Sequence, residues 1–316
     1  KSFEDAESIF ELCKLNVESW AAIIVGYSNH GYFDCVFRLY RMMMQMQKIK
    51  PNIVIFSAIL KACSSIGNIQ KGRIIHACIV WTGMQTDIII GNTLVDMYAK
   101  CGMLAKAQEV LEELPVRDVI SWSTLISGYT QQGQAHEALD CFDRMQNEGL
   151  SPNVVTFISL LKSCGIIGAM REGKKLDEEI VNRGLLEKNS VLGNALMDMY
   201  MKCVMCVQAQ EVFEGLPVRD VISWNVLISG YTQQGKVHEG LNCFECMQIE
   251  GLSHDIVTFI CISKAYGIIR DIEMGKRIHE KFVNRSLFKK DIGVGNTLID
   301  MYAKCNTLIE AHHVLE

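Results

Sequence analysis

Long apolar runs are missing from this sequence of 316 residues, and proline is scarce, with only 4 residues. No apolar stretch approaches the roughly 18 residues that a transmembrane helix requires, so no membrane partner is expected. Few prolines and a hydrophobic content of 49% suit packed helices. The first residues lack the basic and apolar regions of a signal peptide. Both ends of the chain lie inside repeated phrases, which indicates a fragment of a longer protein.

An excess of basic residues is also lacking, because the net charge is -5 and the isoelectric point is about 6.0. Most nucleic-acid-binding domains are basic, so the overall charge counts against that class, although only one face has to be positive. The 13 cysteines do not form the framework of a small secreted protein. Several lie within apolar stripes, which predicts buried, reduced thiols of an intracellular protein.

Catalytic and metal-binding signatures are absent. The sequence has no glycine-rich phosphate loop, no recognisable nucleophile set and no H-x-E of a zinc deaminase. Two C-x-x-C pairs, Cys203 with Cys206 and Cys243 with Cys246, are a cue for zinc. However, 36 residues separate the pairs, which exceeds the spacing of a zinc ribbon, and both pairs fall in expected helices. We therefore expect no metal, no cofactor and no enzymatic activity.

The sequence instead contains repeats. Residues 119–153 return almost unchanged as residues 221–255, a shift of 102 residues. The phrase NTLVDMYAKC at Asn92 recurs as NALMDMYMKC at Asn194 and as NTLIDMYAKC at Asn296. A chain built in this way is an array whose core grows with each repeat, so its length does not imply several globular domains.

One repeat, residues 119–153, has the pattern of a helical hairpin. Its first apolar stripe has helical spacing and consists of Trp122, Leu125, Ile126 and Tyr129. Its second stripe consists of Ala138, Leu139, Phe142 and Met145. Gly133 and Gly149 are expected to end the two helices. Two short helices cannot bury their apolar faces alone, so such hairpins are expected to stack into an all-α, right-handed superhelical solenoid.

Alignment of the repeated phrases divides the chain into repeats of three lengths. Residues 1–16 match the second helix of an incomplete repeat, and residues 292–316 match a truncated one. Between them we expect eight repeats, at residues 17–52, 53–87, 88–118, 119–153, 154–189, 190–220, 221–255 and 256–291. Lengths of about 35, 35 or 36, and 31 alternate in fixed order, which explains the period of 102 residues.

These three kinds of repeat resemble the P, L and S motifs of the PLS-class pentatricopeptide repeat proteins of land-plant organelles. The resemblance covers the whole chain and rests on VISWNVLISGYTQQG with EGLSPN, VVTFISLLKSCGIIGAMREGKKL, and GNTLVDMYAKCGMLAKAQEVLEELPVRD. It implies binding of single-stranded RNA in a mitochondrion or chloroplast, one base per repeat. It further implies a role in choosing sites for C-to-U editing, with editing-complex proteins or a deaminase acting in trans.

Two alternatives remain at this point. The first is an organellar RNA processing or stability factor that blocks nucleases. The second is a protein-interaction scaffold built from tetratricopeptide-like repeats, which have a period of about 34 residues and commonly bind peptides. The repeats of 31 residues ending in LPVRD argue against the tetratricopeptide fold.

One edge of each first helix is expected to face the groove. Ile120, Ser123, Ser127 and Gln131 share one azimuth because their spacings of 3, 4 and 4 residues return to the same side of a helix. The same edge carries six lysines that are expected to contact phosphates, namely Lys61, Lys100, Lys162, Lys202, Lys264 and Lys304. Asp96 before Lys100, and its two copies, also permit a simple ion pair within the helix.

In the family, the fifth and last residues of a repeat together read one base. Carried over by position, the reading pairs are Asn92 with Asp118, Ser123 with Asn153, Asn194 with Asp220, and Asn225 with Asp255. By the family's code these pairs predict the sequence U-A-x-U-U, in which Ile158 with Asn189 leaves x unread. Ser57 with Asp87 implies a preference for guanine, and Asn296 lacks a partner because the chain ends.

The second residue of each repeat is implied to sandwich the base. Apolar residues expected in this role are Ile89, Ile120, Val191 and Ile222. Glu18 and Gly293 are poor substitutes, so the first and ninth repeats are expected to stack weakly or not at all. The simpler explanation of the repeated Asn residues, and of the Asp of VRD, is helix capping.

Overall fold

The computed structural model describes residues 16–47, 49–283 and 291–315, and every regular element within these ranges is helical. This confirms the all-α class. The incomplete repeat expected at residues 1–16 lies outside the described residues, apart from Asn16. The chain divides into two compact units, residues 1–159 and 160–316.

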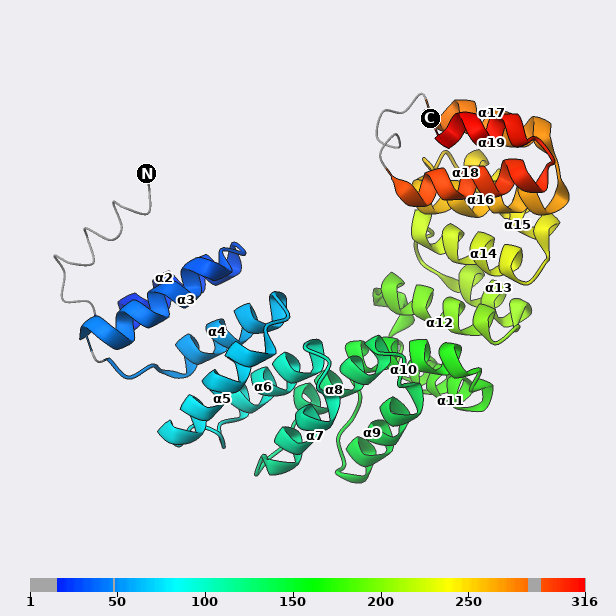
Figure 1. Ribbon diagram of the computed structural model, residues 1–316. Coiled ribbons are helices and arrows are strands. Elements are labelled where there is room, and N and C mark those ends of the chain that lie inside the picture. Colours follow the sequence, from blue (N-terminus) through cyan, green and yellow to red (C-terminus); the bar gives the residue numbers. More distant parts are fainter. Residues whose placement is uncertain (1–15, 48, 284–290, 316) are drawn as a thin grey trace. The chain divides into compact units, whose positions relative to one another are not determined.

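The first unit is a stack of helical hairpins, each lying beside the next (Figure 1). Its described helices are α2 (Val17–Asn29), α3 (Phe33–Met42), α4 (Ile53–Ser65), α5 (Ile69–Thr82), α6 (Ile88–Lys100), α7 (Leu104–Glu113), α8 (Val119–Gln131) and α9 (Ala135–Asn147). A π-helical segment, Met43–Gln47, follows α3. Helix α10 (Val154–Ile167) begins in this unit and ends in the second.

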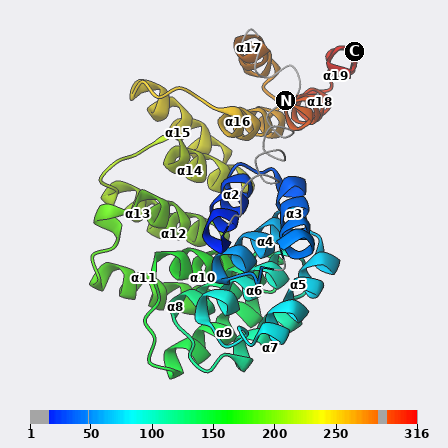
Figure 2. The ribbon, with the colours of Figure 1, turned by 90° about the vertical axis from the view of Figure 1, so that its left-hand side faces the viewer.

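The second unit repeats the arrangement, and its first helices α12, α14 and α16 follow one another along the stack (Figure 2). Its described helices after α10 are α11 (Met170–Asn182), α12 (Ser190–Lys202), α13 (Cys206–Gly215), α14 (Val221–Gln233), α15 (Val237–Ile249), α16 (Ile256–Ile269), α17 (Ile272–Val283), α18 (Ile292–Lys304) and α19 (Leu308–Leu315). A short 3-10 helix, Leu186–Lys188, precedes α12.

The core of each unit lies between the two helices of a hairpin and the neighbouring first helices. All four residues of the first expected stripe are buried, and Trp122, Leu125 and Ile126 have no exposed surface. Small residues let the first helices approach closely: a Cβ on Gly128 of α8 would lie 2.7 Å from Cβ of Ala99 in α6. The stacking expected from the sequence is therefore confirmed within each unit.

An Asp or Asn at the end of one repeat starts the first helix of the next. Asp118 caps α8 and Asp220 caps α14, each with a reciprocal bond to the residue at the third helical position. Asp255 forms the same capping box with Thr258 at the start of α16. These caps satisfy backbone N–H groups that a helix start leaves free. Every first helix therefore begins at a position fixed by one polar side chain.

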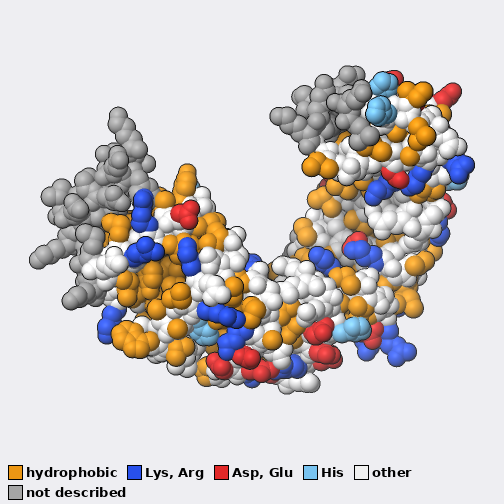
Figure 3. All heavy atoms as spheres, in the orientation of Figure 1, with side chains coloured by type: hydrophobic (Ala, Val, Ile, Leu, Met, Phe, Trp, Pro, Cys, Tyr) orange, Lys and Arg blue, Asp and Glu red, His pale blue; other side chains and the backbone are white. Residues whose placement is uncertain are grey.

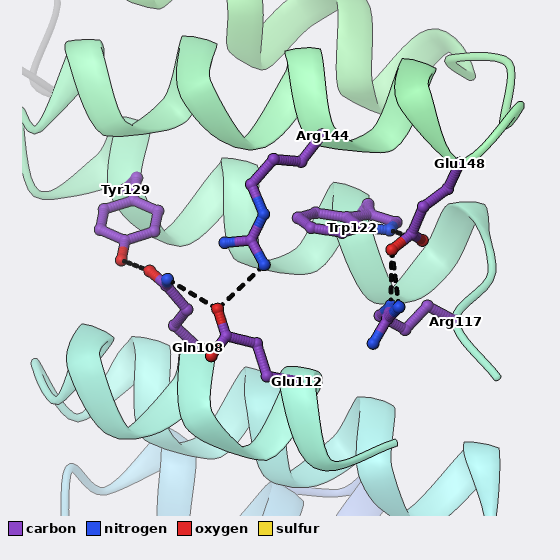
Figure 4. Close-up of polar contacts among 7 residues, drawn as sticks. All are labelled: Gln108, Glu112, Arg117, Trp122, Tyr129, Arg144 and Glu148. Carbon is purple, nitrogen blue, oxygen red and sulfur yellow. Dashed lines mark hydrogen bonds and ion pairs between the residues drawn. The ribbon is translucent and has the colours of Figure 1, made fainter. Parts of the chain in front are cut away.

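A polar network ties α7, α8 and α9 together (Figure 4). Glu148 accepts hydrogen bonds from Trp122 Nε1 and from Arg117, both at 2.8 Å. Arg144 extends from α9 over the Trp122 ring and pairs with Glu112 of α7 at 2.9 Å. Burial raises the pKa of Glu148, but the bonds from Arg117 and Trp122 outweigh burial and hold this pKa below its ordinary value. The network fixes how neighbouring hairpins pack.

Acidic side chains gather over the second helices. In the first unit they cover α7 and α9, where red atoms lie on the visible surface (Figure 3). The exposed carboxylates of these two helices belong to Glu109, Glu112, Glu113, Glu137, Asp140 and Asp143. The described first helices carry six lysines and only four carboxylates. Lysines therefore outnumber carboxylates within the described first helices, whereas the N-cap residues add carboxylates at their starts, namely Asp87, Asp118, Asp220, Asp255 and Asp291.

Within the described residues, no helix combines the length and apolar character needed to cross a membrane. The same residues contain no group of three or more His, Cys, Asp or Glu side chains arranged to hold a metal ion. The thiols of the first C-x-x-C pair have separate partners: Cys203 Sγ lies near the Cys164 carbonyl, whereas Cys206 donates to Gln234 Oε1 at 2.7 Å.

One loop residue is strained. Val204 has a φ of +60°, a region that β-branched residues avoid, and its copies in the other repeats are Gly102 and Asn306. We expect Val204→Gly to raise the free energy of unfolding by about 1 kcal/mol, because glycine adopts this backbone without strain. Urea denaturation followed by circular dichroism measures the change. Gly102→Val is the reciprocal control and should destabilise, whereas an unchanged or lower midpoint for Val204→Gly would contradict the assignment of strain.

Candidate nucleic-acid interface

A hollow of about 370 Å³ lies beside α8 in the first unit. Its lining includes the whole edge expected from the sequence, that is, Ile120, Ser123, Ser127 and Gln131. The four side chains therefore share one face of α8, as their spacing predicts. The lining also includes Asn153 and Val155, at the start of α10, and Lys100, at the end of α6.

The second unit contains an equivalent hollow of about 540 Å³ beside α14. All eleven lining residues of the first hollow have a counterpart 102 positions later in the lining of the second, namely Asp198, Met201, Lys202, Ile222, Asn225, Val226, Ser229, Gly230, Gln233, Asp255 and Val257. Each hollow is therefore lined by an expected reading pair, by two aliphatic side chains and by a lysine of the preceding repeat. The 102-residue period of the sequence therefore also relates the positions of the two hollows.

Two exposed aliphatic side chains border each hollow. Ile120 and Val155 are 58% and 55% exposed in the first, and Ile222 and Val257 are 58% and 51% exposed in the second. Each is the second residue of its repeat. The expected stacking residues Ile89 and Val191 are exposed as well; all these expected residues thus remain available to a base.

Of the four aliphatic side chains that border the two hollows, sequence reasoning missed two, Val155 and Val257. Val54, Val155 and Val257 occupy the second position of the repeats at residues 53–87, 154–189 and 256–291 and are about half exposed. The same rule that selected Ile120 would have selected them. Ile292 fills the first position of the ninth repeat and Gly293 the second, which agrees with the expectation that stacking there is weak.

Two expected reading pairs are in direct contact. Asn225 Nδ2 donates to Asp255 Oδ1 at 3.0 Å, and Asn92 Nδ2 donates to Asp118 Oδ1 at 3.3 Å. Amide and carboxylate together offer a donor and an acceptor, which suits the polar edge of a base. Asn194 is 8% exposed, and its Oδ1 atom has no hydrogen-bond partner among the described residues.

The pair of Ser123 with Asn153 meets through a third residue. The Ser123 hydroxyl donates to the Val119 carbonyl at 2.5 Å and lies 2.6 Å from the Thr156 hydroxyl. The Thr156 hydroxyl, which has a single proton, also lies 2.9 Å from Asn153 Oδ1. The two expected readers are therefore bridged by Thr156, a residue that the sequence did not single out.

The other residues expected to read bases, Ser57, Asp87 and Asn296, have different surroundings. Ser57 lines a wider hollow of about 660 Å³ in the first unit, together with Val54, Lys61, Ile89 and Asn92. Asp87, its expected partner, accepts from the N–H groups of Ile89 and Ile90 and caps α6. Asn296 is exposed on α18.

Helix capping accounts for the last residues of the repeats but not for the fifth. Asp118 accepts from Ser121 N–H at 2.8 Å, whereas the Asn92 side chain bonds to Asp118 and not to a helix start. Burial raises the pKa of Asp118, but the hydrogen bonds from Ser121, Asn92 and Ile120 outweigh it and lower this pKa below the ordinary value. The Asp118 carboxylate therefore stays charged, caps α8 and lies beside Asn92.

The lysines of the edge also make local contacts. Lys100 pairs with Asp96 at 2.9 Å, Lys202 with Asp198 at 2.6 Å, and Lys304 with Asp300 at 2.6 Å, as the alternative interpretation of these residues predicts. Lys61 Nζ donates to Asn29 at 3.3 Å, while Lys162 and Lys264 are exposed. Exposed pairs of this kind are weak, at about 0.2–1 kcal/mol, so these lysines remain available to an anion.

Sequence profiles identify the repeats. The profile described as "PPR repeat family" matches residues 117–165 and 219–267. The profile "Pentatricopeptide repeat domain" matches residues 12–65, and "PPR repeat" matches residues 92–119. The chain belongs to the pentatricopeptide repeat family. This confirms the expected pentatricopeptide repeats, and the first hollow lies entirely within matched residues.

Curated relatives in the pentatricopeptide repeat family come from Arabidopsis thaliana. The chain is 32% identical over its full length to pentatricopeptide repeat-containing protein At5g55740, chloroplastic, and covers 38% of it. It is 37% identical over 82% of its length to the putative protein At3g13770, mitochondrial, and covers 41% of that protein. The chain thus spans about two fifths of the length of these relatives.

Solved structures agree in fold. The pentatricopeptide repeat protein PPR10 in complex with an 18-nt psaJ RNA element matches with a TM-score of 0.81 and 19% identity. That match covers 99% of this chain and 47% of PPR10. A crystal structure of PPR10 from maize matches with a TM-score of 0.51 and 17% identity. These similarities establish the pentatricopeptide repeat fold.

The depressed pKa of Asp118 leads to a stability test. We expect Asp118→Ala to lower the free energy of unfolding by about 1 kcal/mol near neutral pH, because α8 loses its N-cap. A carboxylate with a depressed pKa stabilises above its pKa in the unfolded chain, and this contribution disappears as pH falls through the lower pKa of the folded state. The difference between the two proteins should therefore shrink below about pH 4.

Urea titrations at a series of pH values measure this difference. Asp140→Ala, at an exposed site on α9, is the matched control and should leave the midpoint within about 0.5 kcal/mol of the unaltered protein. A loss in Asp118→Ala that stays constant down to acidic pH would contradict the proposed charged cap.

Proposed function

We propose that this chain binds single-stranded RNA along its first helices, with one base entering each hollow. The observation that carries the proposal is the pair of equivalent hollows around Ser123 and Asn225. Each combines two exposed aliphatic walls, a polar pair and a lysine. Apolar walls suit the faces of a base, the polar pair suits its edge, and the lysine suits a phosphate.

The charge distribution supports the proposal despite the net charge of -5. Carboxylates are concentrated on the second helices, whereas the described first helices carry an excess of lysine. Only the surface along the phosphate backbone has to be positive. Similarity to PPR10, whose crystal structure contains an 18-nt RNA element, supports RNA as the ligand.

The proposed target core is U-A-x-U-U, read by Asn92 with Asp118, Ser123 with Asn153, Asn194 with Asp220, and Asn225 with Asp255. The P-L-S order of the repeats supports a role as the site-recognition part of an organellar C-to-U editing factor. Relatives named as chloroplastic and mitochondrial support an organellar location. Editing-complex proteins or a deaminase in trans would then be the partners.

A binding titration tests RNA recognition. The chain is titrated with short RNAs containing U-A-N-U-U and with scrambled RNAs at two salt concentrations. Tighter binding to the proposed core would support both recognition and the alignment of repeats. Tight binding without preference would discard the base assignments, and no binding at either salt concentration would favour a protein-interaction scaffold.

The two classes of residue should respond differently. Lys202→Ala is expected to weaken binding to all RNAs alike and to reduce the slope of log affinity against log salt by about 0.7, because one phosphate contact is lost. Asn225→Ser should instead change the base preference at one nucleotide. Lys175→Ala, at an exposed position on the second helix α11, is the matched control for charge and should retain the slope. Equal responses to Lys202→Ala and Lys175→Ala would contradict the assignment of phosphate contacts.

A further inference from the structure

The third residue of the following repeat sets the polar surroundings of a reading side chain. After Asn225 this residue is Thr258, whose hydroxyl donates to Asn225 Oδ1 at 2.7 Å. After Ser123 it is Thr156, whose hydroxyl lies 2.6 Å from that of Ser123. Both threonines are completely buried. In these two repeats the oxygen of the reader has a partner on the next first helix.

Other readers lack this partner. Asn92 is followed by Ser121 and Asn194 by Ser223, and each serine hydroxyl donates to its own N-cap Asp, at 2.9 Å and 3.0 Å. Within the described residues, the buried Oδ1 atoms of Asn92 and Asn194 have no hydrogen-bond partner. The buried hydroxyl of Ser57 also has none, and its following repeat has the apolar Ile90 at the third position.

The geometry around Asn225 favours one orientation of its amide. Asp255 Oδ1 already accepts from Asn225 Nδ2 at 3.0 Å and from Thr258 N–H at 2.8 Å. The Thr258 hydroxyl lies 2.9 Å from that same carboxylate oxygen and 2.7 Å from Asn225 Oδ1, but it has a single proton. Asn225 Oδ1 has no other recorded donor, so donation to the amide satisfies a buried acceptor that would otherwise stay unsatisfied.

We propose that Thr258 is a positioning residue that sharpens base selection by Asn225, an inference that rests on the proposed RNA binding. Its β-branched side chain restricts χ1, and its hydroxyl holds the amide carbonyl toward the protein. The amide NH₂ group is then the end presented beside Asp255. The Oδ1 atoms of Asn92 and Asn194 lack this restraint, and only the longer 3.3 Å bond to Asp118 orients the Asn92 amide, so these amides rotate more easily. The repeat of Asn225 therefore discriminates bases more strictly than those of Asn92 and Asn194.

Substitution of the third residue tests the inference. Thr258→Val keeps the shape of the side chain and removes the hydroxyl. We expect it to reduce the ratio of affinities for the best and second-best base about fivefold at one nucleotide only, because one orienting hydrogen bond is lost. Ser223→Thr should have the opposite effect and raise that ratio at the nucleotide read by Asn194. The measurement is a set of binding titrations with every base at every position of the RNA core.

Ser223→Ala is the matched control, because it removes the hydroxyl of an equivalent capping box that does not contact its reader. It should change discrimination by less than about twofold. Circular dichroism and urea midpoints establish that the variants are folded, and Ser223→Thr still tests the inference if Thr258→Val is unstable. Unaltered discrimination in a folded Thr258→Val protein, or in Ser223→Thr, would overturn this inference alone. Failure of the unaltered chain to bind RNA would overturn the proposed function and this inference with it.

Discussion

Each repeat junction depends on the N-cap side chain that closes one repeat and begins the first helix of the next. Asp255 accepts from the backbone of Thr258 and from the amide of Asn225, so a single carboxylate starts α16 and forms half of a proposed reading pair. Asp118 does the same for α8 and Asn92. Because the cap defines where the helix begins, the reader and the aliphatic second residue acquire fixed positions beside it. The same arrangement of side chains thus caps the first helix and forms the proposed reading pair.

Segregation of charge makes the same architecture compatible with an anionic ligand. Glu112 of α7 pairs with Arg144 of α9, and Glu148, just after α9, pairs with Arg117, so these carboxylates contribute to packing between hairpins. Lys100, Lys202 and Lys304 lie in the last turn of their first helices, where a cation also interacts favourably with the helix dipole. The Asp96 partner of Lys100 reduces the local field without burying the ammonium group. A chain with net negative charge can in this way present a weakly cationic edge.

Local spacing was enough to predict the helices, the buried stripe of Trp122 and the edge of Ser123, because these depend on the period of a single helix. It also predicted the ion pair of Lys100 with Asp96. The bond between Thr258 and Asn225 could not be predicted, since it joins residues 33 positions apart on neighbouring helices and depends on how closely those helices pack. The same holds for the contact of Arg144 with Trp122 across α8 and α9. Val155 was predictable in principle but required the stacking rule to be applied to every kind of repeat.

The most direct test of the proposed base reading is to give the first hollow the reading pair of the second. Ser123→Asn combined with Asn153→Asp gives the first hollow the reading pair of the second, beside a threonine that already occupies the third position of the next repeat. Affinities for RNAs carrying each base at each position are then compared with those of the unaltered protein. The account predicts that preference changes from adenine to uridine at one nucleotide, three positions before the uridine read by Asn225, because 102 residues contain three repeats. An unchanged preference, or a change spread over several nucleotides, would contradict it.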